Sequence, residues 1–386
     1  MSEIAAPGAG QAPRPAGPAG PVPHAVEDDR YFVASQWQLM WRKFTRHKLA
    51  IAGGAVLAVF YVFAMFSEFF ATHDILKHSS EFVFMRPQKI RFGDENGWGL
   101  RPFVYDVQKV VDRKAFRRVY VEDPETRNYI RFFVHGDPYK LWGIWEADLR
   151  LAGVEEGAFY LFGTDKLGRD LYSRIVYASR ISLSIGLVGV FLSFVLGCTM
   201  GGISGYYGGK PDMIIQRGIE ILISLPTIPL WMALSAALPT HWGTLKTYFA
   251  ITIILSMFGW AGLARVVRGK LLELRQQDFV TAARVAGRGE GKIVALHLLP
   301  SFMSYLIVSL TLAVPYMILG ETALSFLGLG LRPPVVSWGT LLKDAQNVHA
   351  VLLHPWLLIP GIFVVVAVLA FNFLGDGLRD AADPYK

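Results

Sequence analysis

Six blocks of apolar residues alternate with polar segments along the 386-residue chain. They cover residues 49–70, 181–202, 221–238, 248–266, 302–319 and 356–374. Each block approaches the roughly 20 residues that an α-helix needs to cross the hydrocarbon core of a bilayer. Prolines interrupt the third and fifth blocks, and membrane helices tolerate proline where neighbours satisfy the freed carbonyl groups. The pattern predicts an all-α polytopic membrane protein with six transmembrane helices.

The composition agrees with this class, because 53% of the residues are hydrophobic and only 18% are charged. A net charge of +7 could indicate a nucleic-acid partner, but the basic residues flank the apolar blocks, so we expect a lipid bilayer and no nucleic acid. With six crossings, the flanks before the first block, between the second and third, and after the fourth all lie on one side. The positive-inside rule makes that side the cytoplasm, together with both termini. These basic residues are Arg42, Lys43, Arg46, Lys48, Lys210, Arg217, Arg265, Arg268, Lys270, Arg275, Arg284, Arg288 and Lys292.

The polar segments suggest further divisions of the chain. Residues 1–30 are rich in Ala, Pro and Gly and are expected to form a disordered cytoplasmic tail. Residues 31–70 combine an aromatic and basic interfacial helix with the first transmembrane helix. Residues 71–180 form an extracytoplasmic (periplasmic) insert, in which 118–122 and 129–134 flank a turn-like stretch and predict a β-hairpin. The insert either caps the helices or binds a partner.

The second apolar block carries a helix-packing pattern. Small residues recur every four positions and predict a smooth ridge against which a neighbouring helix can pack closely. They are Gly189, Ser193, Gly197, Gly201 and Gly205. The one cysteine, Cys198, lies in the same block and is interpreted as a small packing residue.

Common catalytic motifs are missing from the sequence, including His-Glu-x-x-His, Gly-x-Ser-x-Gly and cysteine pairs for a metal. Two Gly-Lys pairs, at 209–210 and 291–292, lack both the first glycine and the Ser or Thr of a phosphate-binding loop. We therefore expect no catalytic residue, no metal site and no cofactor held by this chain.

Residues 278–287, between the fourth and fifth blocks, predict a short helix that ends at Gly287. Asp278 is placed to cap it. One face would carry small or apolar side chains, namely Phe279, Ala282, Ala283 and Ala286. Such a helix either packs against its own bundle or inserts into a groove of another protein, and the residues alone leave both open.

The same loop resembles the EAA loop of ABC-importer permeases. The matching positions are Thr281-Ala282-Ala283, Gly287 and His297-Leu-Leu-Pro300, with Thr281 in place of the usual Glu and His297 in place of Ile. The histidine is usual in the dipeptide and oligopeptide branch. The resemblance implies that 267–300 is the ATPase-coupling loop, with Asp278, Thr281, Ala282, Ala283, Gly287, His297 and Pro300 as its site residues.

Further segments are similar to the second permease of dipeptide, oligopeptide and nickel importers: 162–174, 205–212, 321–330, 333–339 and 375–384. The first contains the motif residues Asp165, Gly168, Arg169, Asp170 and Arg174. Its charged residues suit an ion-pair network at the extracytoplasmic surface of the membrane. Glu321 ends a predicted span, where a charge must face protein or water; structural pairing and a place in the pathway or gate both remain open.

The resemblance implies a type I ABC importer permease fold, with a five-helix core at 181–386, in a bacterial inner membrane. It implies a second permease subunit, two cytoplasmic ATPase subunits that bind ATP and Mg, and an extracytoplasmic solute-binding protein. The expected cargo is a dipeptide or oligopeptide; oligosaccharides, opines and metal chelates are alternatives. A membrane-embedded enzyme would show convergent polar groups within its spans, and a secondary transporter would show ionisable ones.

Overall fold

The computed structural model describes residues 36–94, 97–112, 117–155 and 157–382. The predicted tail at 1–30 therefore lies outside the described residues, as does the start of the predicted interfacial segment. The remainder of that segment forms α2 (Gln36–Arg46), which leads directly into the first membrane helix.

Five long helices have the length and apolarity to cross a membrane: α3 (Lys48–Met65), α5 (Leu171–Tyr207), α8 (Thr244–Leu274), α12 (Met303–Phe326) and α15 (Ile359–Ala382). They correspond to five of the six predicted blocks. Pro315 lies inside α12 without ending it, as expected for a membrane helix.

The third apolar block does not form the single straight span that the sequence predicts. Its residues are divided between α6 (Gly209–Ser224) and α7 (Thr227–Ala236), which are bent by 88° relative to each other. Leu225 at the break is extended, with φ −86° and ψ 139°, because a residue that precedes proline disfavours the helical conformation. This pair is a sixth span only if its broken halves are counted together.

The α5 helix is longer than predicted and packs along α8 through the predicted ridge. A Cβ atom built on Gly201 would lie 2.5 Å from the carbonyl oxygen of Ala264, and one on Gly205 would lie 2.8 Å from that of Arg268. Neither helix could approach so closely with larger residues at these positions. Cys198 is buried and free in the same interface, which fits its interpretation as a packing residue.

The insert folds into two antiparallel sheets rather than the predicted hairpin. One contains β1 (Arg91–Asp94), β2 (Gly97–Asp112) and β3 (Arg117–Tyr129), and the other contains β4 (Arg131–Leu141) and β5 (Trp145–Gly153). The predicted hairpin strands belong to different sheets, so that prediction is wrong. Its supposed turn lies within β3, where a register shift between Tyr105 and Asp106 of β2 leaves 124–126 unpaired. Pro124 has no N–H for a ladder bond and suits such an irregularity.

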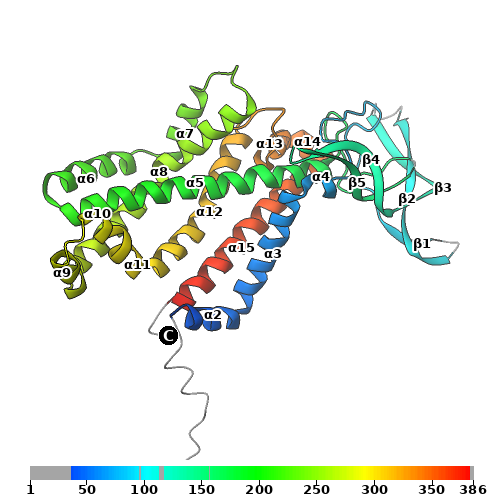
Figure 1. The fold of residues 1–386 in the computed structure, drawn as a ribbon. Helices are drawn as coiled ribbons and strands as arrows, with labels where there is room; N and C mark the ends of the chain where they lie inside the picture. Colours follow the sequence, from blue (N-terminus) through cyan, green and yellow to red (C-terminus); the bar gives the residue numbers. More distant parts are fainter. Residues whose placement is uncertain (1–35, 95–96, 113–116, 156, 383–386) are drawn as a thin grey trace, which may run out of the picture.

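Short helices occupy the two ends of the bundle (Figure 1). One end, here called the loop end, carries α9 (Asp278–Val285), α10 (Glu290–Ile293), the π-helix η1 (Val294–Leu298) and α11 (Leu299–Ser301). The opposite end, here called the insert end, carries α4 (Ser67–Phe70), the sheets, α13 (Trp338–Leu342), η2 (Lys343–Gln346), α14 (Val348–Leu353) and η3 (Pro355–Leu358). The insert itself ends about ten residues before the predicted position 180, because α5 already begins at Leu171.

Candidate functional site

The α9 helix forms at the predicted place, but Asp278 is not its cap. The N-cap is Gln277, which makes no side-chain capping bond, and Asp278 is the first helical residue. A carboxylate in the first turn still interacts favourably with the helix dipole. Asp278 therefore stabilises the start of α9 from the first helical position and not, as predicted, from the N-cap position.

The predicted face of α9 points away from the protein. Val280 is fully buried among Val267, Leu271 and other residues of a small apolar cluster, and Ala283 is half-buried beside it. Thr281, Ala282 and Ala286 are exposed, Phe279 is 42% exposed and Val285 is 84% exposed. Packing against the bundle thus accounts for one side chain and part of another, and leaves most of an apolar helix surface uncovered.

Gly287 ends α9 as predicted. Its φ of 75° is left-handed, and Arg288 donates its N–H to the carbonyl of Ala283 at 3.1 Å, which is the bond of a Schellman motif. A Cβ atom at Gly287 would meet nothing within 4 Å. The backbone conformation, and not the available space, is what favours glycine here.

Two arginines tie the loop to the end of α5. Arg275 donates from Nη1 to the carbonyl oxygens of Gly205 and Tyr206, at 3.3 and 3.2 Å. Arg284 donates from Nη2 to the Tyr206 hydroxyl at 3.3 Å. Cations are favourable at a helix C-terminus, where carbonyl groups lack helical partners. These contacts join α9, and the residue that ends α8, to the C-terminal end of α5.

The segment 205–212 joins α5 to α6 and fixes the position of α8. Gly208 and Gly209 adopt left-handed backbone conformations. Asp212 then accepts hydrogen bonds from the Arg268 guanidinium, one of them from Nη2 at 2.6 Å. Sequence reasoning did not select Arg268 or Tyr206 as site residues, because nothing in the sequence indicates which partners face them across the helices.

The two remaining loop residues lie outside α9. His297 belongs to η1 and is half-buried, and Pro300 belongs to α11 and is exposed. Leu298 between them is fully buried in the same cluster as Val280. This half of the motif therefore packs against the buried side of α9 and does not extend the exposed face of that helix.

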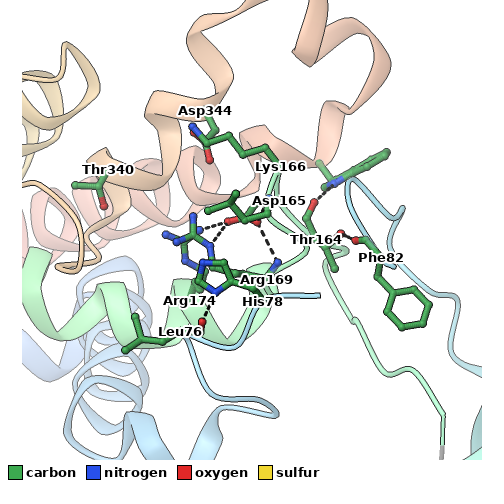
Figure 2. A network of polar contacts seen from close by, with 12 residues as sticks. Leu76, His78, Phe82, Thr164, Asp165, Lys166, Arg169, Arg174, Thr340 and Asp344 are labelled. Atoms are coloured by element: carbon green, nitrogen blue, oxygen red, sulfur yellow. Dashed lines mark hydrogen bonds and ion pairs between the residues drawn. The ribbon is translucent and has the colours of Figure 1, made fainter. Parts of the chain in front are cut away.

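At the insert end, Asp165 is the centre of the predicted ion-pair network (Figure 2). Its Oδ2 accepts from Arg169 Nε at 2.8 Å and from Arg174 Nη1, and its Oδ1 accepts the backbone N–H groups of Leu167 and Arg169. Asp165 and Arg174 are both buried. Lys166 turns outward and pairs with Asp344 of η2. Three of the four predicted charged residues, Asp165, Arg169 and Arg174, form the network, which is largely shielded from solvent.

Gly168 closes the turn that makes this network possible. Its φ is 71°, and a Cβ atom there would lie 1.9 Å from the carbonyl oxygen of Ser79. A side chain at this position would both strain the backbone and clash with the preceding segment of the insert.

Asp170 does not belong to the Asp165 network but caps α5. Its Oδ2 accepts the N–H of Ser173 at 2.8 Å and the hydroxyl of Thr72 at 2.9 Å, and His73 Nδ1 lies 3.7 Å away. Burial by itself would raise the pKa of Asp170, but the nearby His73 and the hydrogen bonds from Ser173 outweigh it and hold that pKa below its usual value. The motif thus anchors the start of α5 to the segment that follows α4.

Glu321 is fully buried and joins three elements. Its Oε1 accepts from Ser325 at 2.7 Å and Ser337 at 2.6 Å, and its Oε2 accepts from Ser182 of α5 at 3.3 Å. Within the described residues, the partners of its carboxylate are these hydroxyl groups and not a cation. Ser325 lies one helical turn from Glu321, whereas Ser182 lies 139 residues away, and sequence reasoning could not identify such a distant partner.

Comparison with known proteins identifies the family to which this architecture belongs. Residues 193–385 match the family described as binding-protein-dependent transport system inner membrane component, and residues 35–87 match the N-terminal TM domain of oligopeptide transport permease C. The sheets of the insert lie between the two matched segments. The predicted type I permease fold and the predicted relation to oligopeptide and dipeptide permeases are confirmed by these matches.

Individual relatives agree with the family match. The chain is 44% identical over 227 residues to the oligopeptide transport system permease protein OppC of Haemophilus influenzae, covering 58% of this chain and 70% of that protein. It is 34% identical over 353 residues to the dipeptide transport system permease protein DppC of Lactococcus lactis subsp. cremoris, covering 91% of each. A solved inward-facing structure of the MetNI methionine ABC transporter has a TM-score of 0.43 at 20% identity, covering 54% of this chain and 95% of that one. The chain therefore belongs to the family of binding-protein-dependent transport system inner membrane components, as an ABC transporter permease subunit that spans the membrane several times.

Proposed function

We propose that this subunit forms half of the translocation pathway of an ATP-driven peptide importer. The relatives named above as oligopeptide and dipeptide permeases support the choice of cargo. A second permease subunit would complete the pathway, and an extracytoplasmic binding protein would deliver the peptide. Oligosaccharides, opines and metal chelates are the alternative cargoes for the same machinery.

The distribution of charge supports an orientation in which the loop end is cytoplasmic. Arg42, Lys43 and Arg46 lie on α2, and Arg275, Arg284 and Lys292 lie on or beside the short helices of the loop. Both groups sit at the same end of the bundle (Figure 1). Under the positive-inside rule, this end and both termini face the cytoplasm and the insert faces outward.

The uncovered surface of α9 is the observation that carries the coupling proposal. A short helix held mainly by Val280, with Val285 84% exposed, has the geometry of a helix that docks in a groove of another protein. In this proposal two cytoplasmic ATPase subunits, which bind ATP and Mg, grip α9 and its counterpart on the second permease. Arg275 and Arg284 then pass the movement to α5.

Thr281 occupies an exposed position on this surface. A hydroxyl cannot replace the charge of the usual carboxylate, so the proposed contact depends on shape and apolar area more than on an ion pair at this residue. Glu321 and the Asp165 network are assigned positioning roles, because both are buried and join the ends of helices.

The docking proposal is tested by substitution of Val285 in the complete transporter. Val285→Asp places a charge in the proposed interface and should abolish both ATPase association and peptide uptake. Val285→Thr keeps the size and branching of the side chain and should retain most of both activities. Normal association and uptake by the Val285→Asp variant would exclude α9 as the docking helix.

The choice of cargo is tested separately. Reconstituted transporter with its binding protein should take up radiolabelled tripeptide, and an excess of unlabelled peptide should compete. Competition by a nickel chelate or an oligosaccharide, with none by peptide, would assign another cargo while leaving the coupling proposal intact.

A further inference from the structure

A patch of exposed aromatic and aliphatic side chains lies where the β4–β5 hairpin meets the end of α3. Its members at the hairpin tip are Trp142, Ile144 and Trp145, which are 44%, 69% and 56% exposed. Phe132 and Phe133, further along β4, are 64% and 62% exposed. So much exposed aromatic surface is unusual for a sheet in contact with water alone.

The patch is fixed to the membrane helix by direct contacts. Trp142 donates its indole N–H to the carbonyl oxygen of Met65, the last residue of α3, at 2.6 Å. The Trp142 ring lies 5.7 Å from that of Phe66, and the Phe133 ring lies 6.2 Å from that of Phe69. The tip therefore cannot move away from the end of α3 without breaking these contacts.

The level of the patch in the membrane follows from the length of α3. Its 18 residues extend about 27 Å at about 1.5 Å per residue, close to the thickness of the hydrocarbon core, about 30 Å. Met65 thus lies at the boundary between acyl chains and headgroups. Trp142, bonded to it, lies at the level where tryptophan is enriched in membrane proteins.

Two of these aromatic residues also have an unusual backbone conformation. Trp142 and Phe133 have left-handed conformations, with φ of 53° and 59°, which bulky residues rarely adopt. Just behind the tip, Lys140 and Glu146 form an exposed ion pair at 3.3 Å. Those charges favour the headgroup layer, so they limit how deeply the tip can enter.

We propose that the β4–β5 tip is a membrane anchor that inserts into the interfacial layer of the lipid bilayer beside α3. The exposed surface of the tip continues the lipid-facing surface of α3, where Val62 and Met65 are 46% and 54% exposed. The anchor fixes the orientation of the insert relative to the membrane plane. This inference rests on α3 crossing the membrane and is independent of the side on which the insert lies and of the cargo.

The anchor is tested with a fluorescent label in nanodiscs. Ile144→Cys is labelled with a nitrobenzoxadiazole maleimide in the complete transporter, in phosphatidylcholine with or without a doxyl quencher near the glycerol end of the acyl chain. Leu100→Cys, at a position that is 99% exposed on β2, is the matched control. Cys198 is buried, so the unsubstituted protein gives the labelling background.

The label at 144 should lose about half of its fluorescence in quencher lipid, because an interfacial residue lies within contact range of the doxyl group. The label at 100 should lose almost none. Trp145→Cys provides a second position and should behave like Ile144→Cys. Equal quenching by doxyl lipid at positions 144 and 100 would overturn the proposal. Iodide, a quencher dissolved in water, provides a second measurement. If the label at 144 became protected from iodide only when the binding protein was added, the patch would be a protein contact and the proposal would also be overturned.

Discussion

The two ends of this membrane bundle are held together by different physical means. At the insert end, buried polar groups join neighbouring structural elements: Asp165 pairs with Arg174, and Glu321 bonds to Ser182 and Ser337. At the loop end, α9 is held mainly by the buried side chain of Val280, and its outer surface is uncovered.

This difference separates a fixed frame from an adaptable surface. Buried hydrogen-bonded groups tolerate little displacement, because each lost partner leaves a desolvated polar atom. An apolar contact can slide at much lower cost. Such an arrangement suits a subunit in which partner ATPases move one end while the other end keeps the helices aligned.

The largest expected effect comes from breaking the frame at Arg174. Arg174→Ala leaves the buried Asp165 carboxylate without its inner partner and should cost about 3–5 kcal/mol, which would greatly reduce the amount of folded protein in the membrane. Lys166→Ala is the matched control, since Lys166 is 56% exposed in its pair with Asp344 and such pairs contribute about 0.2–1 kcal/mol. Thermal unfolding in detergent measures both. Equal losses of stability in the two variants would contradict the larger contribution to stability that is assigned to the buried pair.

Glu321 gives the next largest effect. Glu321→Ala leaves the hydroxyls of Ser182, Ser325 and Ser337 without their acceptor, at about 1–3 kcal/mol for a group that finds no other partner. Glu321→Gln keeps one acceptor oxygen and should be much milder in both thermal unfolding and peptide uptake. If Gln proved as damaging as Ala in uptake alone, the negative charge itself would be required, and a positioning role would be insufficient.

A smaller and local effect is expected for Val280. Val280→Ala removes two buried carbon groups, about 1.6 kcal/mol at about 0.8 kcal/mol each, so amide hydrogen exchange in α9 should accelerate about tenfold. Exchange in α5 should not change. Val285→Ala, at an exposed position on the same helix, should leave the exchange of α9 unaltered; equal acceleration in this variant would contradict the assignment of Val280 as the main contact that holds α9.

The smallest effect is a pH dependence at the insert end. Glu68 of α4 accepts from Arg180 Nη1 and Nη2, at 2.7 and 2.6 Å. Burial would raise the pKa of Glu68, but the Arg180 bonds outweigh it and lower that pKa. The stabilisation is therefore complete above the ordinary glutamate pKa of about 4.3 and is lost as the pH falls through the lowered value. Between about pH 6 and about pH 3, the unsubstituted protein should lose more thermal stability than Glu68→Gln; parallel curves would exclude this contribution.

Hydropathy and spacing predicted the membrane helices and α9 well, because these features depend on local sequence. The apolar blocks correspond to α3, α5, α8, α12 and α15, and the small-residue ridge correctly indicated where α8 packs. The break at Leu225 was not predicted, although Pro226 was the available signal. Hydropathy averages across such a break, whereas the backbone conformation at one residue determines it.

Long-range pairing explains most of what the sequence did not predict. The stretch that resembled a hairpin turn lies within β3 because β2 pairs with both of its flanks. The charged motif at 165–174 was correctly expected to form ion pairs, but Asp170 turned out to cap α5 through Thr72 and Ser173. Thr72 is a partner set by the tertiary fold, 98 residues away, whereas the Asp170–Ser173 spacing of three residues was a local capping signal that sequence reasoning did not use.

Cross-linking from α9 tests the central claim most directly. Ala282→Cys lies on the uncovered face, and a benzophenone maleimide attached there can be photoactivated in membranes that contain the assembled transporter. The account predicts adducts with the ATPase subunits and none from the same probe at Leu100→Cys. Adducts of position 282 with lipid or with the binding protein, and none with an ATPase subunit, would contradict it.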